Sequence, residues 1–161
     1  MFGAAEITAG TFFLFQKPAK LWVFAAGRFR IGGMPVIPWK MAETPIAGNR
    51  YLALISYLPL KHFRAVPKFF QCTFEIQRKL RTSPGLIGYS LEAQPLARKF
   101  WTLSVWSDQQ SLMDFVARVP HSRVMQELAP HLGKSQFARW TVESQEIPPD
   151  WNSAKARITQ S

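Results

Sequence analysis

The sequence predicts an α+β domain whose strands and helices follow one another in the order β-α-β-β-α-β. Four short runs are rich in β-branched and aromatic residues, and two longer runs repeat apolar residues at helical spacing. Proline, glycine or a helix-capping residue stands at the junctions between these runs. The chain has 161 residues, of which 47% are hydrophobic and 19% charged, so it can bury the core of one such domain.

The first strand and the first helix are predicted on either side of Pro59. The run YLALISYL, residues 51–58, has the composition of a strand, and Pro59 closes it. Pro67 suits the first turn of a helix, and the apolar side chains after it recur at helical spacing as far as Leu80. The turn TSPG, residues 82–85, ends this helix.

The second half has two strands before its helix. The runs LIGYSLEA, residues 86–93, and KFWTLSVW, residues 99–106, have the composition of strands joined by a short connection. Asp108 occupies an N-cap position, and the helix after it repeats apolar side chains at i, i+3, i+4 and i+7. The run SQFARWTVES, residues 135–144, is the fourth strand. This order predicts a ferredoxin-like fold, with one four-stranded antiparallel sheet and both helices on one face.

Two further segments flank the predicted domain, which we place at residues 49–147. Residues 1–48 form an N-terminal arm and linker, in which an aromatic and basic stretch is followed by an irregular segment rich in Pro and Gly. The polar residues 148–161 are expected to be a C-terminal tail.

The net charge of +10 lies in the first two thirds of the chain, where residues 51–100 hold eight Lys or Arg against two acids. Such an excess favours an acidic partner, although a well-solvated surface would explain it equally. Nucleic acid is disfavoured because the sheet lacks the aromatic and basic pattern of RNA-binding domains of this fold. In residues 10–31, four cations alternate with Phe and Trp, which suits a membrane surface or packing on a second subunit. We expect a cytoplasmic protein, with a peripheral membrane contact left open.

The strands predict more apolar surface than two helices can cover. Neither face of any strand is simply polar, and a sheet that is apolar on both faces usually buries the second against another subunit. A homodimer is therefore expected. One face of the third strand mixes aromatic rings with hydroxyls, which also suits the wall of a ligand cavity: Phe100, Thr102, Ser104 and Trp106. On the fourth strand, Arg139 could bind a carboxylate or form a salt bridge at the rim.

The stretch VPHSRVM, residues 119–125, contains the histidine best placed for chemistry. Pro120 is expected to begin a new helix, in which His121 leads an apolar stripe and points inward. In a first helical turn the macrodipole favours the neutral imidazole, which can accept a proton or ligate iron. A core histidine bonded to a backbone carbonyl fits the same pattern, so both interpretations stay open.

The other candidates are weaker. His62 is expected on the surface, and His131 near the end of a helix. Cys72 is the single cysteine, so no disulfide can form within the chain, and its place in the first predicted helix suits packing.

The run from Tyr89 to Met125 resembles the dimeric α+β barrel superfamily of antibiotic-biosynthesis monooxygenases. The motifs that carry the resemblance are SPGLIGYSL at 83–91, FWTLSVWSD at 100–108, PH at 120–121 and FARW at 137–140. More narrowly, the chain is similar to small relatives of spheroidene monooxygenase. The resemblance covers roughly residues 50–150 and leaves residues 1–48 unexplained.

The resemblance implies a homodimer with paired sheets and a monooxygenase-like activity on a lipophilic small molecule. Some members bind haem and others use no cofactor, so both remain open. In this scheme His121 is the catalytic residue or the ligand of the haem iron, and Arg139 anchors an anionic group of the cofactor. The substrate would contact Phe100, Thr102, Ser104 and Trp106. The alternative is a non-catalytic module that binds a hydrophobic ligand in the same cavity.

Overall fold

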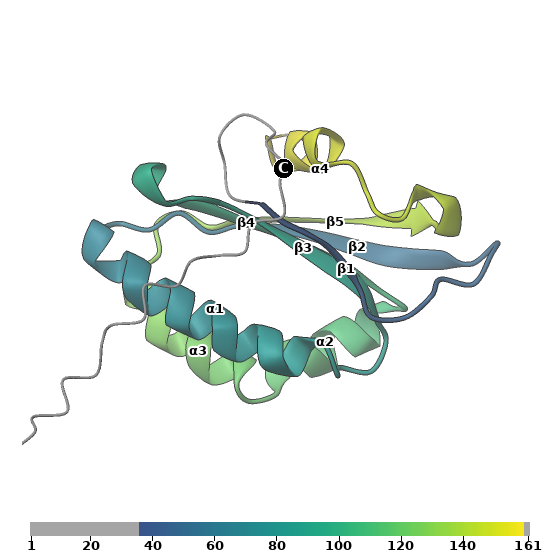
Figure 1. Ribbon diagram of the computed structural model, residues 1–161, viewed down its shortest axis with the longest axis horizontal. Coiled ribbons are helices and arrows are strands. Elements are labelled where there is room, and N and C mark those ends of the chain that lie inside the picture. The colour runs from purple at the N-terminus through teal and green to yellow at the C-terminus, as the bar shows by residue number, and fades with distance from the viewer. Residues whose placement is uncertain (1–35, 160–161) are drawn as a thin grey trace, which may run out of the picture.

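The computed structural model describes residues 36–159, which build one antiparallel sheet with helices on both faces (Figure 1). The strands lie side by side in the order β1-β3-β4-β2-β5. Their bounds are β1 Val36–Met41, β2 Arg50–Tyr57, β3 Leu86–Gln94, β4 Lys99–Trp106 and β5 Gln136–Glu143. The helices are α1 Val66–Leu80, α2 Gln109–Ala117, α3 His121–Leu128 and α4 Trp151–Thr159.

The predicted fold class is confirmed, and the strands and helices predicted between residues 51 and 144 are all present. Asp108 caps α2, because its Oδ1 accepts a hydrogen bond of 2.7 Å from the amide of Ser111. The chain then leaves α2 through an extended Arg118, and α3 begins after Pro120, which takes the N-cap position. The predicted number of four strands is wrong, because the sheet has five.

The extra strand is β1, which lies in the segment expected to be an irregular linker. It pairs with β3, and the Ser90 hydroxyl donates a hydrogen bond of 2.7 Å to the carbonyl of Ile37. The Trp39 ring lies against Gly88, where a Cβ would come within 2.4 Å of it. Pro38 falls where the register shifts and β1 is an edge strand, so the missing amide donor is tolerated.

The segment predicted to be a polar tail contains α4. The Asp150 carboxylate accepts a hydrogen bond of 2.9 Å from the amide of Ser153 and so caps this helix. Ala154 and Ile158 then pack against the sheet. The segment is polar overall because only one narrow stripe of the helix is buried. Where the domain ends as an independently folding unit stays a prediction.

The helices α1, α2 and α3 lie on one face of the sheet and α4 on the other, as Figure 1 shows. We call these the three-helix face and the α4 face. Part of the apolar surface that two helices could not cover is therefore covered within the chain, because α4 packs on Ile55 and Leu103 at the centre of the sheet. Sheet pairing in a dimer would have to accommodate this helix.

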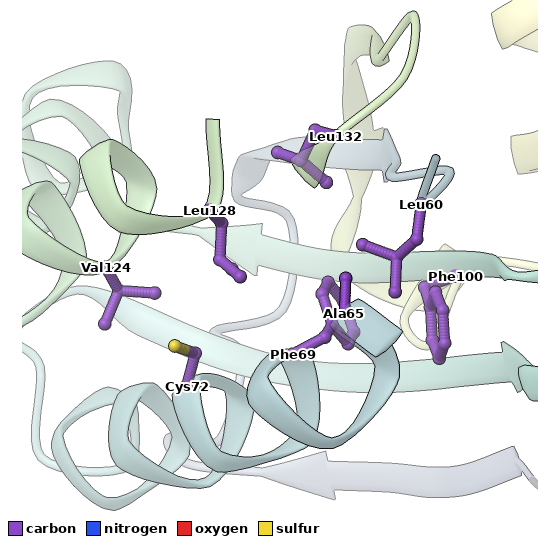
Figure 2. Packing of buried hydrophobic residues seen from close by; sticks show 8 residues of the cluster. All are labelled: Leu60, Ala65, Phe69, Cys72, Phe100, Val124, Leu128 and Leu132. Carbon is purple, nitrogen blue, oxygen red and sulfur yellow. The ribbon is translucent and has the colours of Figure 1, made fainter. Parts of the chain in front are cut away.

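A cluster of apolar side chains fills the space between α1, α3 and the sheet (Figure 2). The rings of Phe69 and Phe100 lie 4.2 Å apart between their centroids. Cys72 of α1 lies beside Val124 of α3, and burial raises the pKa of its thiol. Cys72 is therefore a packing residue, as expected.

Residues 10–31, for which a membrane contact is predicted, lie outside the described residues. Within residues 36–159, no helix combines the length and the apolar character needed to cross a bilayer.

Candidate functional site

A pocket of about 200 Å³ lies where the end of α1 meets α2 and the start of α3. The turn after α1 closes one side and positions the hydroxyls of Thr82 and Ser83. Gly85 lets this turn pass close to Ser111 of α2, because its φ is +75° and a Cβ would lie 2.4 Å from the Oγ of Ser111. His121, the first residue of α3, lines the opposite side.

His121 is half-buried and is held by the end of α2. Its Nδ1 lies 3.2 Å from the carbonyl oxygen of Val116, and its ring lies 5.0 Å from that of Phe115. A carbonyl can only accept, so Nδ1 carries the hydrogen and Nε2 is left as an acceptor. Burial lowers the pKa of His121, and the bond to the Val116 carbonyl opposes this shift only in part. The neutral imidazole is therefore the favoured form.

The structure shows features of both interpretations of His121 that the sequence left open. The ring makes the backbone hydrogen bond of a structural histidine, and it also lines a pocket. A neutral imidazole with a hydrogen on Nδ1 can take a proton at Nε2.

The rim of the pocket is charged. Lys79 and Arg118 supply cations, and Asp114 supplies one carboxylate. Asp114 accepts a hydrogen bond of 2.8 Å from Gln110 and lies 3.8 Å from Arg118, so its charge is already partly compensated. Lys79 consequently leaves the rim with a net positive charge, which suits a ligand that carries or develops a negative charge.

Two of the predicted cavity residues lie just behind this pocket. The Trp106 ring is 5.2 Å from that of Phe115, which in turn contacts His121. The Trp106 Nε1 donates a hydrogen bond of 3.0 Å to the Oγ of Ser104. Trp106 is only 1% exposed, so it backs Phe115 rather than facing the pocket.

The remaining predicted site residues lie elsewhere. Phe100 is six residues from Trp106 along β4, which corresponds to roughly 20 Å at about 3.3 Å per residue, and it is buried against Phe69. Thr102 lies mid-strand opposite Ser56, and Arg139 is exposed on β5. The structure therefore does not gather the predicted residues around one pocket, and their roles in binding stay predictions.

The residues that line the pocket with His121 were missed at the level of sequence: Lys79, Thr82, Ser83, Ser111, Phe115 and Arg118. They come from the end of α1, from the turn after it and from α2. The one usable signal was that Phe115 lies on the apolar stripe of α2, shortly before His121. Only the packing of α1 beside α2 and α3 brings the others to the same place.

The other histidines lie apart from His121. His62 is exposed and precedes a short 3₁₀ turn, Phe63–Ala65, while His131 ends another, Ala129–His131. Across residues 36–159, no three His, Cys, Asp or Glu side chains lie close enough together to hold a metal ion.

The pocket at His121 does not fit haem. Its volume of about 200 Å³ lies below the ~300–1,000 Å³ of pockets that bury drug-sized ligands, and a haem macrocycle is larger than most of those ligands. The neighbouring space is filled, because Phe115 and the buried Trp106 stand behind the ring. We therefore derive no chemical step that involves haem.

No family model and no curated protein matches this sequence. Several solved structures share its fold. A Fusobacterium nucleatum protein assigned as a monooxygenase superposes with a TM-score of 0.58 at 12% identity, over 66% of this chain but only 48% of its own. The heme-degrading enzyme of Listeria monocytogenes superposes with a TM-score of 0.53 at 16% identity, over 68% of this chain and 72% of its own.

A third match is SnoaB of Streptomyces nogalater, a cofactor-independent oxygenase, with a TM-score of 0.50 at 13% identity. It covers 62% of this chain and 98% of SnoaB. The structural neighbours are thus antibiotic-biosynthesis-monooxygenase-like proteins, and the predicted resemblance is confirmed at the level of the fold. The narrower similarity to relatives of spheroidene monooxygenase stays a prediction.

Proposed function

We propose that this protein is a monooxygenase-like enzyme that works without haem and acts on a lipophilic small molecule with an acidic hydroxyl or methylene group. In this proposal His121 removes a proton from that hydroxyl or methylene group. The observation that carries the proposal is the half-buried imidazole whose Nδ1 is bonded to Val116 and whose Nε2 remains an acceptor beside the pocket. The fold shared with a cofactor-independent oxygenase gives further support.

The proposed chemistry balances without a cofactor. The substrate loses two hydrogens and gains one oxygen atom of O₂, and the second oxygen atom leaves with these hydrogens as water; both hydrogens come from a methylene carbon, or one comes from a ring carbon and one from its acidic hydroxyl. All electrons come from the substrate, so it must become electron-rich before it meets O₂. Removal of a proton by His121 achieves this, because a carbanion or phenolate gives up electrons more readily than its conjugate acid.

The surroundings of His121 support this role. The low polarity around the ring keeps it neutral, and the cations of Lys79 and Arg118 stabilise an anion formed in the pocket. The rings of Phe115 and His121 provide an apolar wall for a flat substrate, and the hydroxyls of Ser83 and Ser111 can orient its polar atoms.

The test uses para-nitrophenol, a small probe whose anion is yellow, with the full-length protein. We expect the bound probe to be more ionised than the free probe at the same pH. The His121→Gln variant should still bind the probe but lose this extra ionisation, because an amide cannot take the proton. The matched control is His62→Gln, since His62 is exposed and lies outside the pocket. Equal ionisation in the wild type and His121→Gln would refute the proposed role.

Titration with haemin tests the haem-free part of the proposal. We expect no saturable Soret band that depends on His121. A one-to-one complex that is lost in His121→Gln and kept in His62→Gln would replace this proposal with a haem-dependent one.

The second candidate is a non-catalytic module that binds a hydrophobic ligand. It is favoured by the carbonyl bond of His121, which a structural histidine also makes, and by the engagement of Asp114 with Gln110 and Arg118. Binding of para-nitrophenol without extra ionisation would support this candidate over the enzyme.

We also propose that the protein forms a homodimer. Supporting this, several aromatic side chains around α4 remain half-buried and could meet a second copy: Trp39, Tyr57, Trp101, Trp140 and Trp151. Light scattering during size exclusion tests it, because a single species at 18.4 kDa would exclude the dimer.

A further inference from the structure

Three loops meet at one end of the sheet, where β2 and β3 end and β4 and β5 begin. They are residues 58–65, the β3–β4 turn at 94–99, and residues 129–134. Backbone hydrogen bonds join them, from Leu60 to Arg98, from Lys61 to His131 and from Gly133 to Pro59. We call this surface the basic end, and Figure 1 shows the tip of the β3–β4 hairpin and the start of α1 together at this end of the molecule.

The basic end carries cations and no acids. Its three loops contain five Lys or Arg residues and no Asp or Glu: Lys61, Arg64, Arg98, Lys99 and Lys134. The opposite end of the strands has charges of both signs, with Glu43, Asp108 and Glu143 beside cations such as Arg50. The positive charge of the basic end is therefore not offset by any acid in its own loops.

Two large apolar side chains project from the same end. Leu96, in the hairpin turn, is 91% exposed, and Phe63 is 57% exposed. The Arg98 guanidinium lies 5.0 Å above the Phe63 ring, and Arg98 also donates to the carbonyl of Lys61. The two apolar side chains are thus held among cations by a hydrogen-bonded framework.

We propose that the basic end docks on a membrane surface that contains anionic phospholipids, with Leu96 and Phe63 entering the interface. Apolar side chains ringed by cations match such a surface, because the former enter the acyl boundary while the latter meet phosphates. Nucleic acid fits less well, since Leu96 offers no stacking surface and Arg98 already covers one face of the Phe63 ring. The proposal is independent of the chemistry at His121.

The first experiment places an environment-sensitive dye on a single new cysteine in the full-length protein. Leu96→Cys reports on the basic end, and Ile46→Cys is the matched control, being 66% exposed in the loop between β1 and β2. Cys72 is buried and should not react. We expect vesicles of phosphatidylcholine and phosphatidylglycerol in equal parts to shift the emission of the Leu96→Cys dye to the blue. Phosphatidylcholine alone should shift it little, and the Ile46→Cys dye should not respond.

The second experiment reverses charge on the same labelled protein. Each cation near an anionic surface contributes about fivefold in affinity, so Arg64→Glu with Lys99→Glu should weaken the response at least about 25-fold. Lys40→Glu with Arg78→Glu is the matched control, because both cations are exposed and lie outside the basic end. Since the dye reports on Leu96 itself, membrane binding by residues 10–31 does not mask the result.

Three outcomes would overturn the proposal. These are no shift at Leu96→Cys, equal shifts at both labelled positions, or an equal loss of response in both charge-reversed variants. A shift caused by a double-stranded oligonucleotide but not by anionic vesicles would assign the surface to nucleic acid instead.

Discussion

The two faces of the sheet are covered in different ways. On the α4 face a single short helix closes the centre of the sheet, where Ile55 and Ala154 are 0% exposed and Leu103 is 1% exposed, while the aromatic side chains around the helix stay half-buried. On the three-helix face Leu86 and Trp106 are fully buried, but Leu52, Leu54 and Thr102 at the centre of the sheet remain half-buried in spite of three helices. At the edge of that face Phe137 of β5 is 53% exposed. The number of helices on a face therefore does not determine how well it is covered.

The means of attachment differ as well. The Lys155 ammonium of α4 lies 2.6 Å from the Glu92 carboxylate, which is buried in β3, and 4.7 Å above the Trp101 ring. The three-helix face is held mainly by apolar contacts, and its helices leave a pocket at His121. The centre of the α4 face is therefore closed by one helix and an ion pair, whereas the helices of the three-helix face leave room for a ligand.

The largest expected effect is the loss of an apolar side chain beneath α4. Leu103→Ala should lower the free energy of unfolding by about 3–4 kcal/mol, because a buried leucine loses both its transfer energy and its packing. Leu54→Ala, on the three-helix face, should cost less than half as much, since its side chain is already partly in water. Urea unfolding at one fixed protein concentration measures both. Equal losses would show that Leu54 is packed as tightly as Leu103.

The next effect concerns the ion pair that holds α4. Lys155→Met should cost about 2–3 kcal/mol, which is below the ~3–5 kcal/mol of a fully buried pair because the Lys155 side chain is 29% exposed. The loss arises because Glu92 keeps a buried charge without its partner. Adding Glu92→Gln to Lys155→Met should restore most of the stability. A double variant as unstable as the single one would contradict this account.

The helix caps on the two faces should matter less. Asp150→Ala and Asp108→Ala should each cost about 1 kcal/mol, the usual value of a capping side chain. Backbone hydrogen bonds from Ser153 and Ser111 lower the pKa values of these carboxylates, so their stabilisation is fully present above pH 3.8 and is lost as the pH falls below 3.8 through the lowered pKa values. Hydrogen exchange should quicken in α4 for the first variant and in α2 for the second. Hydrogen exchange that quickens on both faces in either variant would mean that the stabilities of the two faces are coupled.

The smallest effect is the pH dependence that His121 contributes. Burial lowers its pKa from 6.5, so below pH 6.5 the unfolded chain binds a proton that the folded protein resists. Stability should therefore fall as the pH drops through 6.5, and His121→Gln should remove this part of the dependence. Urea unfolding on either side of pH 6.5 tests it. An unchanged dependence in the variant would place the ring in a more polar environment than the structure shows.

Local signals predicted most of the fold. The strands β2, β3, β4 and β5 and the cap at Asp108 follow from composition, alternation and capping chemistry, which act between near neighbours in the chain. The strand β1 and the helix α4 were missed because their stability comes from distant partners. Trp39 needs the bare backbone of Gly88, and Ala154 needs the buried surface around Leu103.

The candidate site, like the fold, was predicted only in part from the sequence. The helical spacing after Pro120 predicted that His121 would point inward, and the structure places it half-buried beside a pocket. The sequence alone suggested that Phe100 and Trp106 would share one cavity with it, because alternation along β4 sets them on the same face. It gave no measure of how far along the sheet each helix extends, and Phe69 fills the space above Phe100.

By itself, the sequence determined the order of the central strands and helices, the face to which each side chain of β4 belongs, and the inward direction of His121. These properties depend on backbone periodicity and on residues a few positions apart. Only the tertiary structure decided that α4 covers the second face, that the turn at residues 82–85 forms the pocket with His121, and that three loops unite into one basic end. Each of these depends on contacts between segments far apart in the chain, and such contacts leave no periodic pattern within either segment.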